Sequence, residues 1–145
     1  MLYSELKKMA VKDLSQYYLL KNSLDILPKE IRILQNSSLY HSPNAYGSSK
    51  PSADNDAKFI NHIARIENLQ LQLENNKAKV SAMETALKAI TSAQRDMLFS
   101  YYINRQRRSV TNLAVDTLTD RSALYRRADR ALKKYILAYF GTLGE

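Results

Sequence analysis

The chain has no cysteine among its 145 residues. This absence excludes disulfides, thiol catalysis and cysteine-ligated zinc or iron–sulfur sites. Two histidines offer little for a histidine metal site, and three glycines form no glycine-rich phosphate loop. The serines near His41 have no identifiable orienting partner, so the pattern of a nucleophile with its base is missing. We therefore expect neither an enzyme nor a bound cofactor.

Long hydrophobic runs are also missing. The longest apolar stretch near the C-terminus, residues 135–140, is far shorter than the ~20 residues that span a bilayer. Charges are scattered through the first 14 residues, which excludes the apolar core of a signal peptide. The sequence therefore predicts a cytoplasmic protein with no membrane partner.

Positive charge is what the chain has in excess. Its 22 Lys and Arg residues against 14 Asp and Glu give a net charge of +8. Residues 95–145 hold ten Lys and Arg against five Asp and Glu, so most of the excess lies in the last third of the chain. Such a balance suits an anionic partner, most simply nucleic acid.

Apolar spacing predicts an all-α fold, because no segment alternates as a strand does. From Leu6 to Leu34 the apolar residues recur at helical intervals, and Pro28 interrupts them. We expect a kink or a break at Pro28, or the first turn of a new helix there. Residues 36–56 contain two of the three prolines and six serines, which indicates a flexible loop, with Asp54 or Asp56 as the next helix cap.

A heptad pattern runs through the central segment from Phe59 to Ile90 and predicts one long helix. The positions of its coiled-coil seam are Ile66, Leu69, Leu73, Asn76, Val80, Met83, Leu87 and Ile90. Such a seam needs another helix, either the N-terminal helix folded back as a hairpin or a second copy in a homodimer. Asn76 either fixes the register of that pairing or lies in a solvated notch.

Capping signals divide the segment 91–145 into three helices. They are a Thr91 and Gln94 capping box before 93–103, Ser109 before 110–117, and Thr119 or Asp120 before a helix to residue 140, with Gly141 after it. Two helices joined by a short break are the layout of a helix-turn-helix. The chain is thus expected to divide into a helical coiled-coil region, 1–90, and a DNA-binding domain, 91–145.

The last helix has an apolar face and a cationic face. The residues expected to pack the helix-turn-helix are Leu113, Ala114, Leu124, Ala128 and Ala131. Hydrogen-bonding side chains and cations lie opposite, as DNA recognition requires. Asp129 is the acidic exception on that side, and we expect it to pair with Lys133 or Arg126.

The motifs Ser109-x-x-x-Leu113-Ala114, Asp120-Arg121-Ser122-x-Leu124-Tyr125-Arg126 and Ala131-Leu132 together resemble the fourth region of bacterial sigma factors. The order of helix, Ser-Pro loop, long helix and terminal module is similar to phage late transcriptional regulators of the ArpU and RinA type. The resemblance implies a DNA-binding regulator of phage or prophage genes in a bacterial host, which would gain affinity by dimerising through the seam or by contacting RNA polymerase. The aromatic residues Tyr135, Tyr139 and Phe140 either make the polymerase contact or pack onto the core of their own domain.

The resemblance also assigns roles to individual residues. Those implied to contact base edges are Arg121, Ser122, Tyr125 and Arg126. Those implied to contact phosphate are Arg105, Arg107, Arg108, Arg127, Arg130, Lys133 and Lys134. About five phosphate contacts would give a log–log salt slope of binding of about −4 to −5.

Two other functions fit the same features. Small terminase subunits of phages also combine a helix-turn-helix with long oligomerising helices and use them to mark DNA for packaging. A coiled-coil assembly protein that binds no DNA would have the seam and an incidental basic tail.

Overall fold

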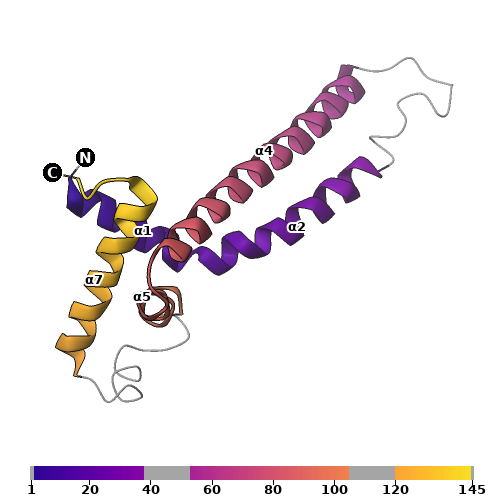
Figure 1. Ribbon diagram of the computed structural model, residues 1–145. Helices are drawn as coiled ribbons and strands as arrows, with labels where there is room; N and C mark the ends of the chain where they lie inside the picture. The colour runs from indigo at the N-terminus through magenta and orange to yellow at the C-terminus, as the bar shows by residue number, and fades with distance from the viewer. Residues whose placement is uncertain (1, 38–52, 105–119, 145) are drawn as a thin grey trace. The chain divides into compact units, whose positions relative to one another are not determined.

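A computed structural model describes residues 2–37, 53–104 and 120–144 of the chain, with side chains from residue 56 onward in the second range. These parts are all helical, as the apolar spacing predicts (Figure 1). The helices in chain order are α1 (Tyr3–Ser15), α2 (Tyr17–Gln35), α4 (Ala53–Ala89), α5 (Ser92–Leu98) and α7 (Arg121–Phe140), with a π-helical turn η1 (Phe99–Ile103) after α5. None of the described helices has both the length and the apolar character needed to cross a bilayer.

The N-terminal segment breaks at Gln16 and not at Pro28. The Ser15 hydroxyl donates to the Lys12 carbonyl at 2.7 Å and competes with the helical bonds there. The break or new helix expected at Pro28 is therefore wrong, because α2 runs through the proline to Gln35. Apolar residues on both sides of Pro28 pack in one cluster with α4, which holds the helix together across the missing backbone donor.

The central helix begins earlier than its sequence signals indicate. Because α4 already starts at Ala53, Asp54 and Asp56 lie inside its first turn, and neither is the expected N-cap. Acidic residues are also favoured within a first turn, where they complement the helix dipole, so composition alone does not separate the two positions. The predicted loop 36–56 therefore ends before Ala53, where α4 begins. Residues 38–52 of this loop lie outside the described part of the chain.

The chain forms two compact units. Unit 1 comprises residues 1–20 and 79–145, and unit 2 comprises residues 21–78. The long helix α4 contributes to both, with the first part of its heptad seam in unit 2 and the last part in unit 1. The domain boundary predicted at residue 90 stays a prediction.

Unit 2 is a hairpin of α2 and α4. Its core consists of Ile31 from α2 with Ile66 and Leu73 from α4, and Leu24, Leu27, Leu34 and Leu69 pack around them. The seam of α4 is therefore closed in this unit by the N-terminal segment folded back, which was one of the two predicted partners. His62 lies at the end of α2, with Nε2 2.8 Å from the Leu34 carbonyl, to which it donates.

Asn76, the polar position in the seam, is buried in unit 2 and lies opposite α2. Its side-chain amide donates to the Ser23 hydroxyl at 2.9 Å, and its carbonyl oxygen accepts from Gln72 at 2.9 Å. A buried polar pair of this kind is satisfied in one alignment of two helices. Asn76 thus favours one register of the hairpin, and it does not lie in a solvated notch.

Unit 1 gathers α1, the end of α4, α5, η1 and α7 around one apolar core. Its most deeply buried large side chains are Leu14, Met83, Leu98, Leu124, Leu132, Tyr135 and Ile136. The seam positions Val80, Met83, Leu87 and Ile90 are all buried in this unit. In η1 the Asn104 amide donates to the Phe99 carbonyl at 2.8 Å, and three consecutive residues, 101–103, are buried. The helix α7 packs against both α1 and α5.

Candidate nucleic-acid interface

The ends of α7 are fixed by the residues that the sequence indicates. Asp120 is the N-cap, and its Oδ1 accepts from the Ala123 amide at 2.8 Å. Gly141 ends the helix with a φ of 76°, the left-handed conformation that glycine adopts without a steric penalty. Of the two rival caps, Thr119 lies outside the described residues, and Asp120 performs the role.

The two faces of α7 are divided as predicted. Leu124, Ala128, Ala131, Leu132, Tyr135 and Ile136 are buried in unit 1. The sequence assigns a DNA contact to eight residues of this helix, and all eight are exposed to solvent. They are Arg121, Ser122, Tyr125, Arg126, Arg127, Arg130, Lys133 and Lys134. A solvent-exposed surface rich in cations therefore lies opposite the buried face of α7. Among these eight residues, the described structure gives an ion pair only to Lys133.

The remaining sequence assignments fall in residues 105–119, outside the described part of the chain. They are the cations Arg105, Arg107 and Arg108 and the packing residues Leu113 and Ala114. The turn of the predicted helix-turn-helix lies in the same segment, so the helix-turn-helix itself stays a prediction.

The helix α1 packs against α7, a contact that the sequence did not predict (Figure 1). The Lys7 ammonium lies 3.1 Å from the Tyr125 hydroxyl and 3.1 Å from Asp129 Oδ1. Lys133 lies 3.5 Å from the other carboxylate oxygen, Oδ2. The expected pair of Asp129 with Lys133 is therefore present, while the ion pair with Arg126 is absent from the described structure and Lys7 takes its place.

This cluster keeps its members charged at neutral pH. Hydrogen bonds to Tyr125 and Asp129 raise the pKa of Lys7 above its ordinary value. Burial by itself raises the pKa of Asp129, but hydrogen bonds and positive charge from Lys7 and Lys133 outweigh it and hold the pKa below its ordinary value. The one acidic group on the cationic side of α7 is thus neutralised by two lysines.

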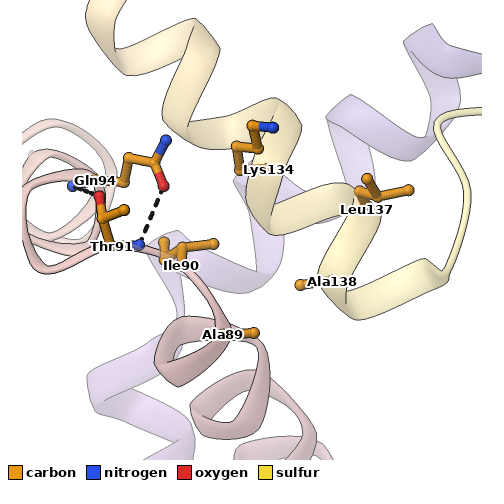
Figure 2. Close-up of a pocket in the computed structure, with 7 residues that line it drawn as sticks. All are labelled: Ala89, Ile90, Thr91, Gln94, Lys134, Leu137 and Ala138. Carbon is orange, nitrogen blue, oxygen red and sulfur yellow. Dashed lines mark hydrogen bonds between the residues drawn. The ribbon is translucent and has the colours of Figure 1, made fainter.

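The opposite flank of α7 faces α5 across two open grooves. One is lined by Arg127, Arg130 and Ala131 of α7 and by Ala93, Gln94 and Met97 of α5. The other is lined by Lys134, Leu137 and Ala138 and by residues 89–91 and Gln94 (Figure 2). Figure 2 also shows the predicted capping box, in which the Thr91 amide donates to Gln94 Oε1 at 3.1 Å and the Gln94 amide donates to Thr91 Oγ1 at 3.2 Å.

The C-terminal aromatic residues belong mainly to the core. Tyr135 is 1 % exposed, and its ring stacks on that of Tyr139 with centroids 5.7 Å apart. Its hydroxyl has no hydrogen-bond partner within the described residues, and burial raises the pKa of Tyr135. Only Tyr139 and Phe140, both partly buried, retain surface for a protein partner.

Replacing Tyr135 by phenylalanine is expected to raise the free energy of unfolding of unit 1 by about 1 kcal/mol. A buried hydroxyl without a partner costs about 1–3 kcal/mol, and phenylalanine removes that cost with little change of shape. Near-UV circular dichroism during urea unfolding measures the change, because eight of the ten tyrosines lie in unit 1.

The matched control is Tyr17→Phe. The Tyr17 hydroxyl donates to Glu84 at 3.4 Å, so the same substitution there is expected to lower the stability by about 0.5–1.5 kcal/mol. Two changes of the same sign would contradict the assignment of an unpartnered hydroxyl at Tyr135.

Comparison of the chain with protein-family models, with curated proteins and with solved structures gives no match.

The contacts of Lys7 with α7 are the feature of this candidate interface that the sequence did not predict. Lys7 and Asp129 lie 122 positions apart, and no local pattern links them. One local pattern in the sequence does point to the α1 side of this contact. Tyr3 and Lys7 are four residues apart and lie beside the apolar stripe of Leu6, Ala10 and Leu14. That spacing places both side chains at the edge of a buried face.

Proposed function

We propose that the chain is a sequence-specific DNA-binding regulator of phage or prophage late transcription, acting in the cytoplasm of a bacterial host. Promoter duplex would bind along the solvent face of α7. The observation that carries the proposal is the division of this helix into a buried, mainly apolar back and an exposed face with five cations. These five are Arg126, Arg127, Arg130, Lys133 and Lys134, and Arg121 is exposed at the start of the helix.

The distribution of charge supports the same proposal. Unit 2 has seven Lys and Arg residues against six Asp and Glu, a net charge of +1, whereas unit 1 has fifteen against eight, a net charge of +7. Nearly all of the excess positive charge therefore belongs to the unit that contains α7. A concentrated field of one sign steers a polyanion to that surface and raises its association rate.

Within this proposal the residues divide by position along α7. Arg121, Ser122, Tyr125 and Arg126 occupy the first two turns and would contact base edges, as side chains at the start of a recognition helix do. Arg127, Arg130, Lys133 and Lys134 follow and would contact phosphates. A contact with RNA polymerase would use the accessible parts of Tyr139 and Phe140.

Selection of bound fragments from the encoding genome tests the proposal. The full chain is incubated with sheared duplex at physiological salt, and the retained fragments are sequenced. Enrichment upstream of late genes is the expected result. Recovery of fragments in proportion to their abundance would contradict sequence-specific regulation.

A second candidate, a DNA-packaging or assembly protein, is favoured by apolar residues on the outer faces of unit 2. Ile26 and Ile33 of α2 are 47 % and 63 % exposed, and Ile60 and Leu71 of α4 are 64 % and 62 % exposed. Each pair recurs on one helix face. The near-neutral charge of this unit suits a second copy of the chain. A ring of eight or more copies by light scattering would favour this candidate, and a monomer or dimer the regulator.

A further inference from the structure

We propose that α1 is a second phosphate-binding element, which extends the DNA interface of α7 through Lys8 and Lys12. The inference rests on the proposed DNA-binding function and adds residues to which the sequence gives no role. In unit 1, the helix α1 packs against α7.

The contact between the two helices fixes which side of α1 faces the cationic surface. Lys7 bonds to Tyr125 and Asp129, and its ammonium lies 5.4 Å from the centre of the Tyr125 ring. Lys133 lies 5.9 Å from the centre of the Tyr3 ring. Tyr3 and Lys7 of α1 therefore pack against one flank of α7, the flank that carries Tyr125, Asp129 and Lys133. The outward side of α1 lies next to this flank.

That outward side of α1 carries two more cations. A shallow hollow on the surface is lined by Ser4, Lys7, Lys8, Val11 and Lys12. Lys8 and Lys12 are exposed, and neither forms an ion pair within the described residues. The two lysines lie at i and i+4, so about 6 Å of helix separates them. Each DNA strand carries a phosphate about every 3.4 Å along the axis, so two steps span about 7 Å, and two lysines separated by about 6 Å can each reach a phosphate of one strand.

Lys7 has a different role, which is to remove a repulsive charge. An ionised Asp129 on the DNA-facing flank would repel phosphate, and Lys133 alone would have to offset it. Lys7 supplies a second cation at 3.1 Å from the carboxylate, so the flank between the helices becomes net positive. The helix α1 thus contributes one lysine that neutralises the acid and two that are free to bind.

The test is the salt dependence of duplex binding by the full-length Lys8→Gln/Lys12→Gln variant. Losing two phosphate contacts is expected to make the log–log slope shallower by about 2, at about 0.9 per contact. The matched control is Lys29→Gln/Lys58→Gln, which removes the same charge from exposed positions in unit 2 and is expected to keep the wild-type slope.

An unchanged slope for the α1 variant, or an equal change in the control, would overturn the inference while leaving DNA binding by α7 intact. Absence of salt-dependent binding by the wild-type chain would overturn the proposed function as well. In a second arm, Lys7→Gln is expected to weaken binding and added Asp129→Asn to restore it. Failure of that rescue would contradict the neutralising role of Lys7.

Discussion

Replacing Leu124 by alanine is expected to lower the free energy of unfolding of unit 1 by about 2–5 kcal/mol. Leu124 is 0 % exposed and lies one turn after the Asp120 cap, where α7 enters the core. Removing its side chain loses the burial of apolar surface and leaves a cavity that a close-packed core refills only in part. This loss is a large part of the 5–15 kcal/mol that stabilises a typical domain.

The control for this prediction lies on the same helix. Leu137 is 46 % exposed, so Leu137→Ala is expected to change the stability by no more than about 0.5 kcal/mol. Urea unfolding followed by near-UV circular dichroism of the tyrosines compares the two variants. Similar losses in both would show that the apolar back of α7 is not the face that packs the core.

Replacing Arg126 by alanine is expected to weaken binding to a selected duplex by roughly 5- to 150-fold, which corresponds to roughly 1–3 kcal/mol. Arg126 is exposed on the second turn of α7 and forms no ion pair within the described residues, so its guanidinium is available to a base edge. The same change is expected to relax sequence preference, because binding to random duplex depends mainly on phosphate contacts.

Lys134→Ala is the matched control for the role of Arg126. Lys134 is exposed two turns later on the helix and is assigned to phosphate, so its loss should weaken selected and random duplexes alike. Affinities of both variants are measured on both duplexes at one salt concentration. Equal losses on selected and random DNA for Arg126→Ala would contradict the assignment of a base contact.

The features that the sequence predicts well are those set by local pattern. The ends of α7 follow from two local effects. The Asp120 side chain caps the first turn, and Gly141 ends the helix in a left-handed conformation. The apolar and cationic faces of α7 follow from the helical period alone. The heptad seam identifies the buried face of α4 in the same way, although it leaves open which helix covers that face.

The features that the sequence does not predict depend on distant contacts. Pro28 carries a strong local signal for a break, yet the apolar cluster around Ile31 stabilises the helix through it, and the break occurs at Gln16. The packing of α1 on α7 joins residues more than a hundred positions apart through Lys7. Tertiary packing outweighs local propensity in both cases.

The most direct test of DNA binding through the cationic face of α7 is the affinity of the full chain for duplex DNA, measured between about 50 and 200 mM salt. Over this interval, a protein with six or more phosphate contacts typically loses about a thousandfold or more in affinity. DNA binding through this face predicts a log–log slope of about −4 or steeper, since about five phosphate contacts give this value. A slope shallower than about −1, corresponding to a single contact, would contradict it.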